Sequence, residues 1–113
     1  MCNMKQHEDA FLLRVFLGEN DRHKGKPLYE QIVLKARELG LTGATVSRGI
    51  LGFGADSRLH SSKILTLSED LPVIIEIADS EEKINLLLPF LDTWVSEGLV
   101  TLEKVSVIKY RHI

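Results

Sequence analysis

Two strand-like segments of this chain carry apolar side chains on both of their faces, and this feature limits the possible folds most strongly. Residues 11–17, FLLRVFL, are too short for a helix and end at Gly18, so they predict a strand. Residues 71–79, LPVIIEIAD, predict a second strand with an unbroken apolar side. Because successive side chains of a strand point to opposite faces, both strands need cover on two sides.

Two amphipathic helices are available as cover. Pro27 suits the first turn of one helix, and Gly40 ends that helix as a left-handed cap. Asp79 and Glu82 have the spacing of a capping box at the start of the second helix. Pro89 lies inside this second helix and predicts a kink or an early end there.

Three further segments complete the predicted secondary structure. Residues 43–51 read as a strand, because β-branched residues outweigh the glycines. Residues 63–67 are a possible short strand. Residues 99–110 form the last strand, and their valines share one side only if a bulge falls near Glu103 and Lys104.

The order strand, helix, strand, strand, helix, strand is that of the ferredoxin-like βαββαβ fold, an α+β architecture. Right-handed crossovers place both helices on one face of a four-stranded antiparallel sheet. The other face then exposes Leu12, Phe16 and Ile74, each of which gains roughly 1.5–3 kcal/mol on full burial. We therefore expect another copy of the protein to cover this face. Arg14 and Glu76 share the face, and we expect them to pair across adjacent strands.

Length, composition and charge exclude several classes of protein. The chain has 113 residues, and we divide it into a flexible polar tail, 1–10, and a single domain, 11–113. The net charge of −2 provides no broad basic field, so we expect neither nucleic-acid binding nor membrane insertion. No apolar run approaches the roughly 18 residues of a membrane helix. With no signal peptide at its beginning and a single cysteine, Cys2, the chain is expected to be cytoplasmic.

A long connection of about nineteen residues follows the second strand, and connections of this length are usually functional or disordered. It opens on GILGFG, in which Gly52, Phe53 and Gly54 could turn successive N–H groups toward an anion. Positive charge lies nearby at Arg48, Arg58 and His60. From the pattern alone, glycines for a bulge and charges for solubility explain the segment equally well.

Three long runs resemble the uncharacterised PII-like family called domain of unknown function 190. They are FLGENDRHKGKPLYEQIV, ARELGLTGATVSRGILGFG and LTLSEDLPVIIEIADSEEKI, and the likeness covers about residues 11–110. The resemblance implies a ferredoxin-like subunit related to the PII nitrogen-signalling proteins, in a trimer whose sheets face inward. It also implies an effector loop after the second strand, with a Gly-Phe-Gly motif beside a nucleotide cleft between subunits. Gly52, Phe53 and Gly54 match that motif.

The chain also departs from the PII pattern. PII proteins follow the motif with Arg-Gln, whereas this chain has Ala55 and Asp56, so that Arg58 or His60 would have to replace the missing cation. The PII glycine- and lysine-rich phosphate loop has no match in DTWVSEGLVTLEK. The resemblance therefore implies either a nucleotide or a smaller, differently held anion.

Other readings remain open beside this one. Asp56, His60 and Ser61 have the residue types of a small hydrolase triad, but no nucleophile-elbow pattern accompanies them, so we expect no enzyme and no catalytic residues. The histidines are isolated, so we expect no metal site and no cofactor; a divalent-cation-responsive role rests on fold analogy alone. Our expectation is a trimeric, non-enzymatic sensor that binds a small anionic ligand, orders the 55–70 loop and signals to an unknown target protein.

Overall fold

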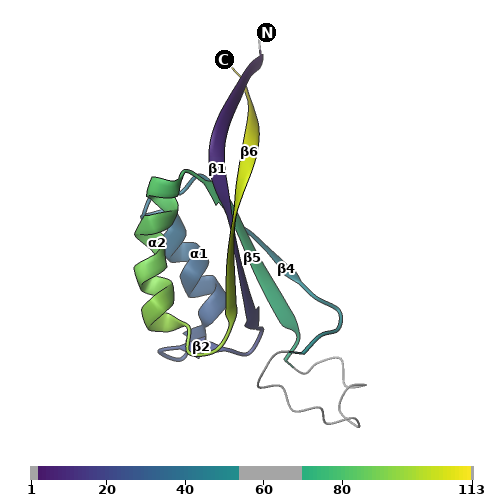
Figure 1. Cartoon of the computed structure of the whole chain (residues 1–113). Coiled ribbons are helices and arrows are strands. Elements are labelled where there is room, and N and C mark those ends of the chain that lie inside the picture. The colour runs from purple at the N-terminus through teal and green to yellow at the C-terminus, as the bar shows by residue number, and fades with distance from the viewer. Residues whose placement is uncertain (1–2, 54–69, 113) are drawn as a thin grey trace.

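The computed structural model describes residues 3–53 and 70–112 and has an α+β, ferredoxin-like fold (Figure 1). A four-stranded antiparallel sheet has the strand order β4-β5-β1-β6, and two helices cover one of its faces. A two-stranded hairpin, β2-β3, precedes the first helix. The predicted fold class is confirmed. The elements are β1 (Asn3–Gly18), β2 (Arg22–His23), β3 (Lys26–Pro27), α1 (Leu28–Glu38), β4 (Thr45–Arg48), β5 (Pro72–Asp79), α2 (Glu81–Trp94) and β6 (Leu99–His112).

The core lies between the helices and one face of the two central strands. Alternate residues of β1 and β5 point into it, and the antiparallel register sets Leu13 opposite Ile77 and Val15 opposite Ile75. The helices contribute apolar residues at helical spacing, which is why their sequence pattern was readable. The largest fully buried side chains are Leu13, Ile32, Ile75, Ile77, Ile84, Leu87 and Val15.

The predicted end of α1 is confirmed, because Gly40 has φ +89° and the Leu41 N–H donates to the Ala36 carbonyl at 3.0 Å. The predicted start of α2 is wrong by one residue. The Ser80 hydroxyl, not Asp79, caps the helix by accepting the Lys83 N–H at 3.2 Å. Asp79 instead ends β5, and its carboxylate accepts hydrogen bonds from Thr42.

Of the two outcomes predicted at Pro89, a kink or an early end, the early end is wrong, since α2 continues to Trp94. Pro89 and Asn85 both lie on the exposed side of the helix, so the Asn85 carbonyl, which receives no hydrogen bond from the proline, is accessible to solvent rather than buried. Leu87 and Leu91 are buried against the core on either side of Pro89. Their burial keeps the last turn of the helix in place.

Three strand predictions need correction. Residues 3–10, expected as part of a flexible tail, belong to β1, because β6 supplies a partner strand as far as the Asn3–His112 pair. The strand expected over 43–51 is shorter, and β4 covers only Thr45–Arg48. No bulge interrupts β6, since Glu103 lies opposite Leu12 and Lys104 opposite Phe11 in one continuous register. The possible strand over 63–67 lies outside the described residues.

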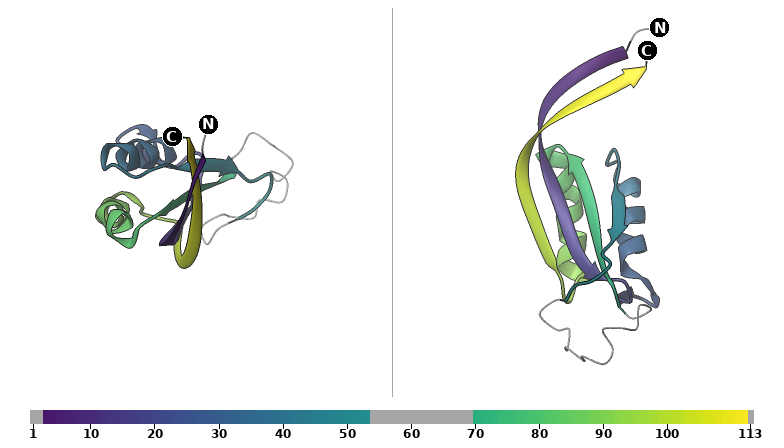
Figure 2. Two further views of the ribbon diagram at one scale, coloured as in Figure 1. Left: turned by 90° about the horizontal axis from the view of Figure 1, so that it is seen from above. Right: turned by 90° about the vertical axis from the view of Figure 1, so that its right-hand side faces the viewer.

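The longer strands form an arm that extends beyond the helix-covered body (Figures 1 and 2). Strand β5 pairs only with Phe11–Gly18 of β1, so residues 3–10 and 105–112 pair only with each other. We call this two-stranded ribbon the arm. It accounts for the elongated shape of the molecule, whose extents are 55 × 28 × 23 Å. Neither described helix is long and apolar enough to cross a membrane.

Candidate functional site: the open sheet face and its glycine-rich edge

The sheet face opposite the helices carries large apolar side chains that the subunit itself leaves half-buried. Leu12 and Phe16 of β1 and Ile74 of β5 lie on this face, which we call the open face. In Figures 1 and 2 no helix or strand of the described residues covers it. The uncovered face expected from the sequence is therefore present.

A charged cluster crosses the centre of the open face. The Arg14 Nε donates to Glu76 Oε2 at 2.9 Å, and its Nη1 donates to Glu103 Oε1 at 3.1 Å. The hydrogen bond to Glu76 raises the pKa of Arg14 above its ordinary value, and partial desolvation opposes it only in part. The side chains of Arg14 and Glu76 are 38% and 39% exposed, so this pair sits between the apolar residues rather than out in water. The predicted pair is confirmed, and Glu103 is an additional partner.

The glycine-rich segment folds over Pro72 at one end of the sheet. The Gly49 N–H donates to the Pro72 carbonyl at 2.7 Å, which extends the β4-β5 pairing by one residue. A Cβ on Gly49 would lie 2.7 Å from Pro72 Cγ, a distance that real Cβ atoms do not show, so only glycine fits. At Gly52 the same distance is 3.1 Å. These two glycines therefore have a packing role, and Gly52 does not adopt the positive φ typical of an anion-binding nest.

The predicted ligand residues fall into two groups. Arg48 ends β4 and Gly52 and Phe53 follow it within the described residues, whereas Gly54, Arg58 and His60 lie outside the described residues. Arg48 forms an ion pair with Glu19, which reduces the positive charge that it can offer to an anion. Phe53 is 76% exposed and packs into no described core. Asp56 and Ser61 of the hydrolase reading also lie outside the described residues.

Sequence analysis missed the exposed apolar side chains next to these glycines. Ile50 is 88% and Leu51 is 71% exposed, and like the exposed Phe53 they follow the edge strand β4 in the sequence. Their type gave a signal, but we placed both residues in a strand of 43–51. Large apolar side chains with this exposure are typical of surfaces that bind a partner or a ligand.

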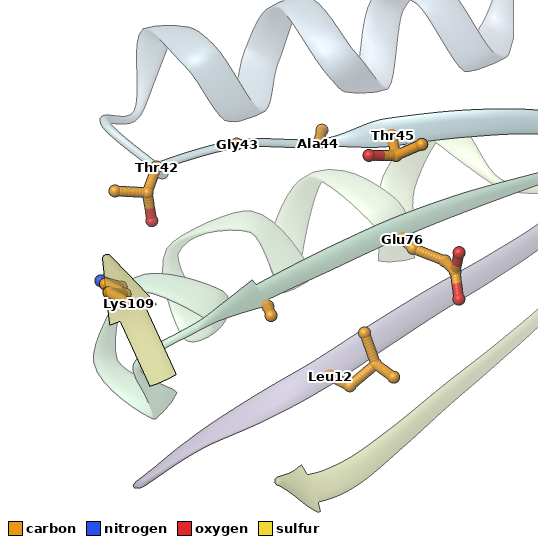
Figure 3. Close-up of a pocket in the computed structure, with 8 residues that line it drawn as sticks. Leu12, Thr42, Gly43, Ala44, Thr45, Glu76 and Lys109 are labelled. Atoms are coloured by element: carbon orange, nitrogen blue, oxygen red, sulfur yellow. The ribbon is translucent and has the colours of Figure 1, made fainter. Parts of the chain in front are cut away.

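A hollow of about 520 Å³ lies at the other end of the open face (Figure 3). Residues 42–45 bound it on one side, and Leu12 and Glu76 bound it on the other. Lys109 enters from the arm, and its Nζ lies 2.6 Å from Glu8 Oε1. The hollow contains both a carboxylate and an ammonium group together with threonine hydroxyls. Sequence reasoning missed it, because its lining residues come from four segments that lie far apart in the sequence.

Asp79 fixes one wall of this hollow. Its Oδ2 accepts the Thr42 N–H at 2.9 Å and the Thr42 hydroxyl at 2.7 Å. Partial burial raises the pKa of the Asp79 carboxyl, but hydrogen bonds from Thr42 and Ser80 and the Lys83 ammonium outweigh it, so the pKa lies below its ordinary value. The ionised carboxylate therefore holds the chain after α1 against the start of α2.

The charged stretch before α1 forms a tight turn. Lys24 has φ +52° and Gly25 has φ +78°, as a two-residue hairpin turn of the primed type requires. His23 stacks on Trp94 with 4.5 Å between ring centroids, and Phe90 meets Trp94 edge to face. Trp94 therefore anchors the hairpin to α2. Within the described part of the chain, no group of three His, Cys, Asp or Glu residues has the arrangement of a metal site.

The sequence of this chain matches a known protein family and several of its members. Residues 10–107 match the family domain of unknown function 190, described as "Uncharacterized ACR". A UPF0166 protein of Aquifex aeolicus is 43% identical over 97 residues, which cover 86% of this chain and 91% of the relative. A UPF0166 protein of Methanocaldococcus jannaschii is 38% identical over 101 residues, which cover 88% and 93% of the two chains.

Solved structures show the same fold at low identity. The apo form of CPII, a nitrogen regulatory PII-like protein from Thiomonas intermedia K12, has a TM-score of 0.64 and 16% identity, covering 94% of this chain and 99% of CPII. CPII bound to ADP, AMP and bicarbonate has a TM-score of 0.65 and 16% identity, covering 90% and 96%. At this identity the likeness concerns the fold alone. The chain thus has a PII-like ferredoxin fold and belongs to the family domain of unknown function 190.

Proposed function

We propose that this protein is a PII-like regulatory protein that binds a small anionic ligand at clefts between the subunits of a homotrimer. The observation that carries the proposal is the open face, on which Leu12, Phe16 and Ile74 remain half-buried around an ion pair. A second copy that covers this face creates intersubunit clefts at its edges. The similar fold of CPII, which has been solved with ADP, AMP and bicarbonate, makes an adenine nucleotide or bicarbonate the first ligands to test.

The ligand site of this proposal lies at the β4 edge and combines Gly52, Phe53 and Gly54 with Arg48, Arg58 and His60. Phe53 offers an exposed ring on which a base or a neighbouring subunit packs. Because Glu19 already pairs with Arg48, most of the free positive charge must come from Arg58 and His60.

Binding then switches the 55–70 connection between two states. Fixing a long connection costs conformational entropy, and contacts that the ligand makes only in the ordered state offset this cost. The ordered connection presents a surface to the target protein that the free state lacks. No chemical step is involved, so the protein acts as a sensor and not as an enzyme.

Calorimetric titration tests the proposal with AMP, ADP, ATP, cyclic AMP, bicarbonate and phosphate. At least one of these ligands should bind, and Arg58→Ala should weaken its binding about tenfold or more, since a hydrogen bond to a charged group contributes roughly 1.5–3 kcal/mol. Phe53→Ala should also weaken binding without loss of folding stability, because its ring is exposed. Arg37→Ala is the matched control, since it removes the same charge from an exposed position of α1 and should bind normally.

Three results contradict the proposal. Failure of the whole panel to bind removes the sensing role and leaves a protein-interaction role. Turnover of a ligand that disappears in His60→Ala favours the hydrolase, and binding that requires an added divalent cation favours the cation-responsive alternative. A native mass equal to that of one chain would show a monomer, which has no cleft between subunits and therefore no site of the proposed kind.

A further inference from the structure

Three strands of the sheet meet at one corner, and an ion pair joins the ends of the two outer ones. Strand β5 begins at Pro72 and lies between β1, which ends at Gly18, and β4, which ends at Arg48 (Figure 1). The register sets Gly18 opposite Pro72 and Arg48 opposite Val73, so the ends of β1 and β4 flank the start of β5. Glu19 follows β1 directly, and Arg48 Nη2 donates to its Oε2. The ion pair therefore connects two strands that do not pair with each other.

The backbone of the turn after β1 holds Glu19 in place. The Glu19 N–H donates to the Leu71 carbonyl at 2.8 Å, and the Asn20 N–H donates to Asp70 Oδ1 at 2.9 Å. The Glu19 side chain is only 22% exposed. A carboxylate that is fixed in this way loses little conformational entropy when it pairs with Arg48. Its effective concentration at the guanidinium is therefore high.

Glu19 is the carboxylate of this corner that pairs with Arg48 alone. Asp21 Oδ2 accepts the Gly18 N–H at 3.0 Å, and Asp70 Oδ1 accepts a backbone N–H as well. Among the described residues, the side chains of Glu19 and Arg48 have no partner except each other. The Arg48 side chain is 59% exposed, so an anion in solution can reach its guanidinium without a rearrangement of the sheet.

We propose that Glu19 is an internal competitor, which occupies Arg48 until an anionic ligand displaces it. The Glu19 carboxylate and an anionic ligand offer the guanidinium the same kind of acceptor oxygen, so the two exclude each other. Only the fraction of molecules in which Arg48 is free of Glu19 is competent to bind, and this fraction raises the dissociation constant of every such anion by one common factor. The inference rests on the anionic ligand of the proposed function and names the residue that limits its affinity.

Two substitutions of Glu19 test the competition by calorimetric titration of the full chain with bicarbonate, phosphate and AMP. Glu19→Asp keeps the charge and withdraws the carboxylate from Arg48 by one methylene group, whereas Glu19→Gln keeps the length and removes the charge. Both should lower the dissociation constants about two- to fivefold, because an exposed ion pair has a small equilibrium constant, and the factor should be the same for all three anions. Glu30→Gln is the matched control, since it removes a negative charge from an exposed position of α1 and should bind like the parent chain.

The same titrations in an Arg48→Gln background separate competition from a general effect of charge. Glu19→Asp should change nothing there, because the competitor has no guanidinium to occupy. A gain that persists in this background, or one that grows with the charge of the anion, overturns the inference, since Glu19 would then act through its electric field. Equal binding by the parent chain and both Glu19 variants overturns the inference and leaves the proposed function, whereas absence of binding in all of them removes both. Urea unfolding verifies that each variant is folded, and either Glu19 variant decides the question alone.

Discussion

The two faces of the sheet are built by the same strands and the same residue types, yet they differ in cover. On the helix side, Leu13, Val15 and Ile75 are completely buried. On the open side, Leu12, Phe16 and Ile74 are only half-buried. Folding of one subunit thus realises the full burial energy on one face, roughly 1.5–3 kcal/mol per large side chain, and only part of it on the other. The comparison teaches that one face specifies the fold and the other is available for assembly.

The largest expected effect compares neighbouring isoleucines on opposite faces. Ile75→Ala should lower the free energy of unfolding by about 2–5 kcal/mol at every protein concentration, because it opens a cavity in the core. Ile74→Ala should cost less in dilute solution and more when the protein is concentrated, because the proposed assembly covers this side chain with another subunit. Urea unfolding at two well-separated protein concentrations measures both. An equal cost of Ile74→Ala at both concentrations would show that no other subunit covers the open face.

The charged cluster on the open face gives an intermediate effect. Glu76→Gln removes the negative charge of the carboxylate that accepts the Arg14 Nε–H at 2.9 Å. An exposed pair contributes about 0.2–1 kcal/mol, whereas breaking a pair that has become buried costs about 3–5 kcal/mol. The loss should therefore approach the lower value in dilute protein and rise on assembly.

Glu103→Gln is the control for that substitution. Glu103 also binds Arg14, but its side chain is 57% exposed and nearer the edge of the sheet. Its removal should cost less at high concentration than the removal of Glu76. The same denaturation series ranks the two variants, and the reverse order would show that the assembly does not cover the centre of the open face.

Much of the fold was predictable because its signals are local. Alternation along 11–17 and 71–79 identified two strands and both of their faces, and it also predicted the Arg14–Glu76 pair, since both residues lie on the reverse side. Helical spacing and Gly40 identified α1. Each of these features depends on residues within one element or on two adjacent strands.

The arm was not predictable for the opposite reason. Residues 3–10 are polar and aperiodic, and they form a strand because residues 105–112, almost a whole chain length away, pair with them. The Glu8–Lys109 ion pair joins the same distant segments. In the candidate site, the neutralisation of Arg48 by Glu19 and the packing of Gly49 on Pro72 were equally hidden. Contacts between segments that lie far apart in sequence leave no pattern in either segment alone.

The smallest effect should come from Asp79, the last residue of β5. Hydrogen bonds lower its pKa in the folded protein, so its contribution to stability is present above the unfolded pKa of about 3.9 and is lost as the pH falls through the lower folded pKa. Asp79→Asn should cost about 1 kcal/mol at neutral pH and remove this part of the acid sensitivity. Unfolding measured from pH 7 to pH 2 follows the difference.

Thr42→Val serves as the partner variant, because it removes the hydroxyl that donates to Asp79 at 2.7 Å and keeps the N–H. It should weaken the same acid-dependent step without abolishing it. Since Asp79 fixes the chain after α1 within one subunit, the cost of both variants should not change with protein concentration. A concentration-dependent cost would mean that the assembly also contacts the wall of the hollow at Thr42. The contact surface between subunits would then extend beyond the open face.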